Sequence, residues 1–133
     1  MTVVVRITAI LALLVVPALA AAEELTKRDA RGPVTVVATL IPPAAAGEPL
    51  RVKVALDTHS VGLDSVVFER AVALRKPDGT EVAPTAVEAT GAGHHRQTVI
   101  VFPAPAPDTP VVLVVKAVGG VAERVFTWQA LPR

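Results

Sequence analysis

Apolar and polar positions alternate along much of the chain after residue 33. In the segment 50–57 (LRVKVALD), every second residue is apolar and the residues between them are charged or small. A period of two predicts a strand with one face buried and the other in water. The same pattern places Asp57 on the polar face, so we expect its carboxylate to point away from the core.

Short runs of this kind recur, and proline and glycine separate them at intervals of about ten to fifteen residues. Phe126 and Trp128 share one face of the last run, so we expect them to be the largest core side chains. The run 66–75 is ambiguous: it fits a strand, and it also fits a helical turn that leads into a short strand. Seven strands in roughly 100 residues indicate an all-β, immunoglobulin-like or fibronectin-like Greek-key sandwich. The seven runs are 34–41, 50–57, 66–75, 80–87, 96–102, 111–117 and 121–128.

The first 22 residues have the order of a cleaved signal peptide. Arg6 is their one charge, an apolar run covers 7–16, and small residues follow Pro17. A peptidase site of the A-x-A type fits cleavage after Ala20 or after Ala22, and an uncleaved anchor is the alternative. We therefore expect a protein of the periplasm or the cell exterior. Its expected parts are a signal peptide at 1–22, a flexible charged leader at 23–33 and the sandwich domain at 34–133.

Composition narrows the chemistry further. Of 133 residues, 52% are hydrophobic, 13 are basic, 12 are acidic and none is cysteine. Loss of Arg6 with the signal peptide would leave 12 residues of each sign. The balanced charge therefore does not indicate binding to nucleic acid, or to a membrane beyond the signal segment. Without cysteine, disulfides, thiolate nucleophiles and cysteine zinc sites are excluded, and any metal must be held by histidine and carboxylate.

All three histidines lie in two short segments, 57–64 (DTHSVGLD) and 91–96 (GAGHHR). In an immunoglobulin-type Greek key, the second strand lies antiparallel beside the fifth. The end of the run 50–57 would then lie beside the start of the run 96–102. We therefore expect four candidate metal ligands to converge at one rim of the sandwich: Asp57, His59, His94 and His95.

Two or three imidazoles with a carboxylate are a suitable shell for Zn²⁺ or Cu²⁺. Ser60, Asp64 and Arg96 are candidates for the surrounding groups that orient such a shell. The alternative is a hydrogen-bond network that only fixes the loops. In it, Asp57 or Asp64 would accept from a loop N–H, and Arg96 would pair with a carboxylate. The protein would then be a structural or adhesive interaction module.

An enzymatic function has little support in the sequence. Ser60 beside His59 or His94 could be drawn as a hydrolase, but no G-x-S-x-G elbow is present. Paired catalytic carboxylates, a P-loop and a G-x-G-x-x-G motif are also missing. We therefore expect a non-enzymatic exported domain that binds a divalent metal or a partner protein through the rim.

The segment VALDTHSVGLD (54–64), followed by GAGHHR (91–96) and VFP (101–103), resembles a family of uncharacterised small exported prokaryotic proteins. That family carries D-T-H-S-V-x-L-D and G-x-G-H-H stretches, and the resemblance spans roughly residues 50–103. Gly62 stands at a position that is often acidic in the family, which speaks against a loop that gathers several carboxylates. The resemblance implies no activity. It implies that five residues act as one unit: Asp57, His59, Asp64, His94 and His95.

Overall fold

The computed structural model describes residues 24–129. The predicted signal peptide, 1–22, lies outside the described residues and stays a prediction. Within the described part of the chain, no helix is long and apolar enough to span a bilayer.

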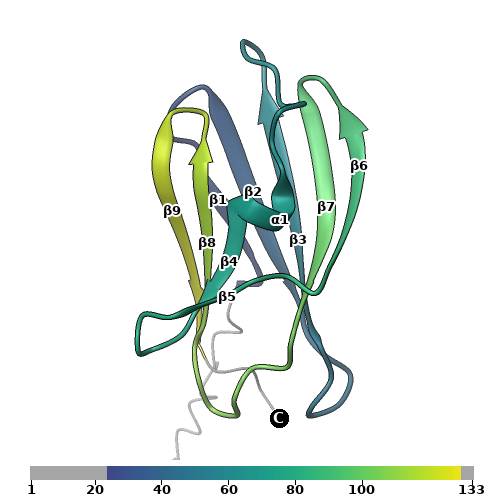
Figure 1. The fold of residues 1–133 in the computed structure, drawn as a ribbon, viewed down its shortest axis with the longest axis vertical. Coiled ribbons are helices and arrows are strands. Elements are labelled where there is room, and N and C mark those ends of the chain that lie inside the picture. Colours follow the sequence, from purple (N-terminus) through teal and green to yellow (C-terminus); the bar gives the residue numbers. More distant parts are fainter. Residues whose placement is uncertain (1–23, 130–133) are drawn as a thin grey trace, which may run out of the picture.

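The described residues form two antiparallel sheets that pack face to face, with one helical turn (Figure 1). The all-β class predicted from the alternation is confirmed, with nine strands in residues 24–129 in place of about seven. The elements are β1 (Thr26–Asp29), β2 (Val34–Ile41), β3 (Leu50–Thr58), α1 (Phe68–Ala71), β4 (Val72–Arg75), β5 (Glu81–Val82), β6 (Ala86–Ala92), β7 (His95–Phe102), β8 (Val111–Val118) and β9 (Val121–Trp128).

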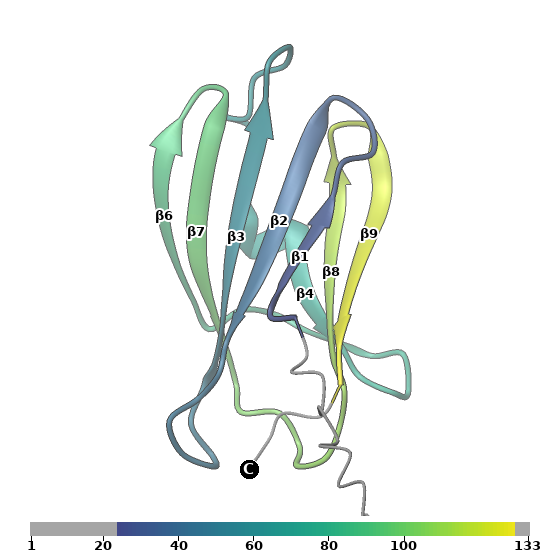
Figure 2. The same cartoon turned by 180° about the vertical axis from the view of Figure 1, so that it is seen from behind.

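The strand order is β1-β2-β3-β7-β6 in one sheet and β5-β4-β8-β9 in the other. From behind, the five-stranded sheet faces the viewer, with β6 at its outer margin (Figure 2). The predicted antiparallel pairing of the second and fifth runs is confirmed as β3 with β7, where Asp57 stands opposite His95. This register brings the two histidine-bearing segments to the same end of the sandwich.

Strand β1 corrects the flexible leader expected for 23–33. Residues 26–29 pair antiparallel with β2, beginning with Thr26 opposite Thr39. None of the four side chains of β1 is fully buried, so its sequence lacks the alternation that reveals an interior strand. A short edge strand is held by backbone hydrogen bonds and by contacts with its neighbours, and the local sequence indicates neither.

The run 80–87, predicted as one strand, is divided between the two sheets. Glu81–Val82 forms β5 against β4, Pro84 follows, and Ala86–Ala92 forms β6 against β7. Proline has no N–H for a ladder hydrogen bond, which favours departure from the first sheet at this point. The ambiguous run 66–75 contains the helical turn α1 followed by the strand β4, as one of its two interpretations predicted.

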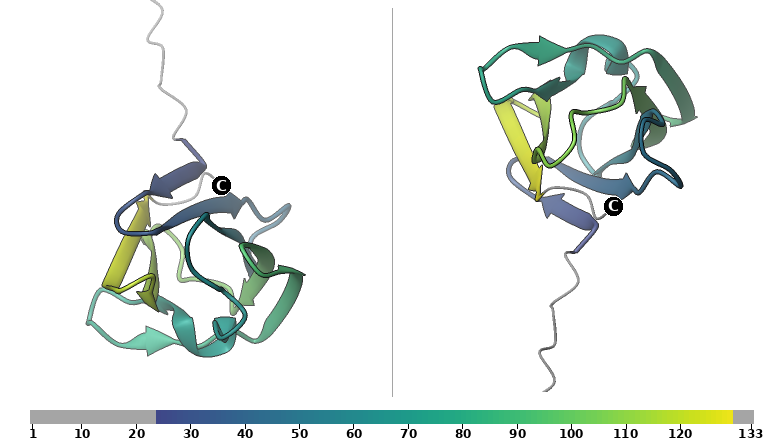
Figure 3. Two further views of the ribbon diagram at one scale, coloured as in Figure 1. Left: turned by 90° about the horizontal axis from the view of Figure 1, so that it is seen from above. Right: turned by 90° about the horizontal axis from the view of Figure 1, so that it is seen from below.

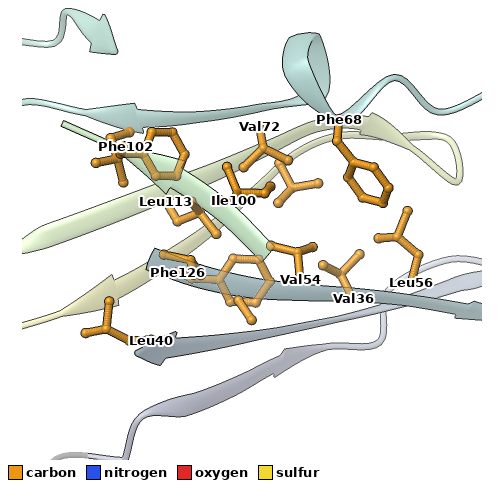
Figure 4. Packing of buried hydrophobic residues seen from close by; sticks show 14 of the residues in the cluster. Val36, Leu40, Val54, Leu56, Phe68, Val72, Ile100, Phe102, Leu113 and Phe126 are labelled. Atoms are coloured by element: carbon orange, nitrogen blue, oxygen red, sulfur yellow. The ribbon is translucent and has the colours of Figure 1, made fainter. Parts of the chain in front are cut away.

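The core fills the space between the sheets. Side chains from both sheets meet there, with Val54 on one side and Leu113 on the other (Figure 4). Phe126 and Trp128, predicted as the largest core side chains, are 3% and 0% exposed. Burial of a side chain of this size contributes about 2–3 kcal/mol to folding. Asp57 is 56% exposed, as the alternation predicted.

A buried arginine links β1 to β9. The side chain of Arg124 has no exposed surface, and its Nη1 lies 3.0 Å from Oδ1 of Asp29. Its Nη2 donates to Val118 O at 3.1 Å. At the other end of β1, Nε1 of Trp128 donates to Leu25 O at 3.0 Å. Strand β1 therefore closes the side of the sandwich between β2 and β9, as the view from above shows (Figure 3).

Candidate functional site

The loop after β3 and the β6–β7 hairpin are joined by hydrogen bonds. Leu63 N donates to Gly93 O at 2.9 Å. In return, Gly93 N donates to Oδ1 of Asp64, also at 2.9 Å. These bonds join residues 57–66 and 91–96 into one surface, which we call the histidine rim. It lies at the upper end of Figure 1.

Thr58 ends β3 and turns the chain out of the sheet. Its hydroxyl donates to Pro33 O at 2.8 Å and accepts from Ser60 N at 3.3 Å. A threonine hydroxyl bonded to the backbone N–H two residues later forms an ST-turn, which ends the alternation of the strand. His59 is therefore carried on an exposed turn, and not on the face of β3 where a period of two would place it.

A two-residue turn, Gly93–His94, connects β6 to β7. Its glycine has φ +68°, a conformation that strains residues with a side chain. At Gly91, φ is +82° and a Cβ atom would lie 2.5 Å from His95 O, so the strand must carry glycine to reach the turn. The histidine of the turn stands exposed at the tip of the hairpin.

Arg96 supports the histidine rim from the core side of β7, where it stands opposite Leu56. Its Nη1 donates to Leu63 O at 2.9 Å and to Val66 O at 2.7 Å. The guanidinium carbon lies 4.8 Å from the centre of the Phe68 ring. These contacts correct the expected pairing of Arg96 with a carboxylate. On the core side of the sheet, backbone carbonyls hold the guanidinium.

Asp57 and His95 face each other across β3 and β7 on the outer surface of the sheet. Nδ1 of His95 lies 3.6 Å from Oδ1 of Asp57, and the two side chains are 65% and 56% exposed, respectively. Water screens this pair, so it contributes little to stability. Its exposure instead leaves the carboxylate and the imidazole accessible to a ligand from solution.

The structure brings together two of the four candidate metal ligands. Asp57 and His95 are neighbours, whereas His59 lies on the turn after β3 and His94 at the tip of the hairpin. Among residues 24–129, no group of three or more histidine, aspartate and glutamate side chains is placed to hold a metal ion. The separation follows from the ST-turn and the hairpin, which carry two of the histidines off the strand faces.

No protein-family model matches the chain, and no curated protein and no solved structure matches it.

The expected supporting residues take different roles. Asp64 accepts from the N–H of Gly93, as the loop-fixing alternative predicted. Ser60 donates its backbone N–H to Thr58, and no hydrogen bond among the described residues joins its hydroxyl to a histidine. Sequence reasoning missed Thr58 and Phe68. The first had a signal, since the hydroxyl of a threonine at the end of a strand can accept from the backbone N–H two residues later and form an ST-turn. The contact of the Phe68 ring with a guanidinium distant in sequence had none.

Two cavities lie at the opposite end of the sandwich. One, of about 420 Å³, is lined by the β2–β3 loop (43–48) and the β7–β8 connection (104–109). The other, of about 400 Å³, lies between that connection and strands β4 and β5. The view from below shows these connections around the open end of the sandwich (Figure 3). Neither cavity contains a predicted site residue.

Proposed function

We propose that this chain is an exported, non-enzymatic interaction module that binds a partner protein through the histidine rim. The observation that carries the proposal is the double contact of Gly93 with Leu63 and Asp64, which ties two loops together. A preformed surface loses little conformational entropy on binding, so more of the contact energy remains as affinity. His59 and His94 are exposed on this surface and present polar rings to a partner.

An immunoglobulin-like connectivity is part of this proposal. The orders β2-β3-β7-β6 and β4-β8-β9 correspond to the ABED and CFG sheets of a constant-type immunoglobulin sandwich. Strands β1 and β5 are then additions at one edge of each sheet. The histidine rim would consist of the B–C and D–E connections, and connections at the end of such a sandwich are a common place for recognition.

Photo-crosslinking in a host that exports the protein tests for the partner. A photoreactive residue in place of His94 should give a defined protein adduct, and addition of His59→Ala should weaken that adduct. Asp64→Ala, which releases the hairpin from the loop, should weaken it as well. The photoreactive residue in place of Lys53, on the outer face of the five-stranded sheet, is the control. Equal adducts from both positions, or none from position 94, would contradict the proposal.

A divalent metal is the second candidate ligand, favoured by the approach of Asp57 to His95. A carboxylate oxygen and an imidazole nitrogen 3.6 Å apart provide half of a Zn²⁺ or Cu²⁺ shell. His59 and His94 are carried on turns at the same end of the sandwich, and a local movement of either turn would complete the shell.

Thermal unfolding with added Zn²⁺ or Cu²⁺ tests the metal site. Free metal at a hundredfold excess over Kd should stabilise the protein by ~2.7 kcal/mol. We expect the shift to disappear in His95→Ala and to shrink in the double variant His59→Ala with His94→Ala. Asp78→Ala, in the β4–β5 turn, is the control and should keep the full shift. The same shift in every variant would exclude these residues as ligands.

Export is tested separately. Protein recovered from the periplasm or the medium should begin at Ala21 or Glu23, because the two peptidase sites follow Ala20 and Ala22. A recovered chain that keeps Met1 would contradict cleavage.

A further inference from the structure

Strand β6 is a free edge of the five-stranded sheet. It pairs with β7 on one side, and within residues 24–129 no strand pairs with its other side. Six of its seven residues are exposed, and Figure 2 shows the strand at the outer margin of the sheet. The backbone N–H and C=O groups that point away from β7 are therefore accessible to another strand.

The other sheet edges are short or covered. Strands β1 and β5 have four and two residues, respectively. Strand β9 is long, but the segment before β2 lies along it. Arg31 donates to Glu123 O, and Trp128 donates to Leu25 O. Short edge strands and covering segments are two ways in which proteins protect an edge. Strand β6 has seven residues, and within residues 24–129 no strand lies along its outer side.

The residues of β6 also leave its backbone accessible. The strand Ala86–Ala92 (AVEATGA) has no proline and no lysine, and Glu88 is its single charge. Small side chains let a second backbone approach to hydrogen-bonding distance. When two such strands pair antiparallel over their full length, the pairing is centred on the middle residue, Ala89.

We infer that β6 pairs antiparallel with β6 of a second copy about Ala89, which would join the two sheets into one. In this register Glu88 stands opposite Thr90 of the other copy, so the two carboxylates do not oppose each other. Val87 stands opposite Gly91, which has no side chain to meet the isopropyl group across the pair. A contact through one strand is small, so the dimer is weak. The inference does not depend on the histidine rim.

Charge substitutions at Thr90 test this register. Thr90→Lys would place an ammonium group opposite Glu88 in both halves of the dimer, and Thr90→Glu would place a carboxylate there. With two such cross-strand pairs, we expect Kd to fall by about two- to thirty-fold for Thr90→Lys. For Thr90→Glu we expect a rise by a similar factor. Sedimentation equilibrium of the purified protein from about 10 µM to about 1 mM measures both changes.

Thr127 provides the matched control, because it is an exposed threonine on β9. Thr127→Lys and Thr127→Glu should leave Kd unchanged. The double variant Glu88→Lys with Thr90→Glu should restore the dimer that Thr90→Glu weakens, and thermal melting shows which variants fold. A wild-type protein that stays monomeric at about 1 mM would overturn the inference. So would a dimer whose Kd does not respond in opposite directions to Thr90→Lys and Thr90→Glu.

Discussion

The guanidinium of Arg124 on β9 meets the carboxylate of Asp29 on β1, with Nη1 and Oδ1 3.0 Å apart across 95 positions of the chain. The arginine side chain has no exposed surface, and that of Asp29 is 14% exposed. A cation without access to water depends on such partners, because desolvation removes several kcal/mol of hydration energy. Substitution of either residue of this pair should therefore weaken the attachment of β1 to β9.

Asp29→Ala should destabilise the fold strongly. The substitution leaves the buried charge of Arg124 without its carboxylate, and loss of one partner of a buried pair costs about 3–5 kcal/mol. Urea unfolding followed by Trp128 fluorescence measures the change. The double variant Asp29→Ala with Arg124→Met should recover much of the loss, because no charge then stays buried. An unchanged midpoint for Asp29→Ala would show that the pair does not hold β1.

Stability should fall in acid as Asp29 takes up a proton. Its hydrogen bond from the Arg31 guanidinium, aided by the charge of Arg124, lowers the pKa of Asp29 from 3.8 to about 2. A lowered pKa in the folded state gives stability that is complete above the unfolded value and is lost as the pH falls through the folded one. We therefore expect a decline between about pH 4 and pH 2.

The variant Asp29→Asn isolates this contribution, because it cannot titrate. Other carboxyl groups also lose their contribution to stability in acid, because their pKa values are lowered in the folded protein. The Lys116 ammonium lowers the pKa of Glu81, and the Thr80 hydroxyl lowers the pKa of Asp78. Unfolding free energies of wild type and Asp29→Asn should therefore converge towards pH 2. A difference that stays constant from pH 7 to about pH 2 would contradict the assignment.

Gly119→Ala should be far more costly than Gly120→Ala, although both glycines lie in the β8–β9 turn. At Gly119 a Cβ atom would lie 2.7 Å from Cγ2 of Val34, whereas at Gly120 it would meet nothing within 4 Å. Both have positive φ, so each substitution carries a backbone strain of about 1–2 kcal/mol. We expect overpacking to add about 1–3 kcal/mol at Gly119 alone. Equal melting temperatures for the two variants would contradict this.

Arg96→Lys should loosen the histidine rim, although it keeps the charge. Nη1 of Arg96 donates to both Leu63 O and Val66 O while the guanidinium plane stacks on Phe68, and a compact ammonium group cannot keep both contacts at once. We expect a loss of about 1–3 kcal/mol and faster hydrogen exchange of the Leu63 amide. Arg70→Lys, on the exposed side of α1, is the control and should change neither. Unaltered exchange in Arg96→Lys would remove this residue from the support of the rim.

Burial explains which elements were predictable. A strand that covers the core must alternate, so 50–57 revealed β3 and the exposed side of Asp57. Strand β1 has no buried side chain, and therefore no alternation. The division of 80–87 depended on Pro84 and on which sheet each half could join. The choice of sheet is a property of the whole fold, so the local sequence could not predict it.

The candidate site was predictable in its location and not in its detail. Its location followed from topology, since β3 and β7 are neighbours and each histidine lies near an end of one of them. The detail depended on single hydrogen bonds between groups distant in sequence. The Thr58 hydroxyl turned His59 off the strand face, and Arg96 bonded to carbonyls that no pattern of residues indicates.

The closure of the sandwich by β1 has a consequence for the order of events in folding. The contacts that fasten this strand join Leu25 to Trp128 and Asp29 to Arg124, across 103 and 95 positions. Contacts of such long range form slowly, because a long loop must close before they contribute. They also require β9, so the sandwich cannot close before Val121–Trp128 has been synthesised and has folded onto β8.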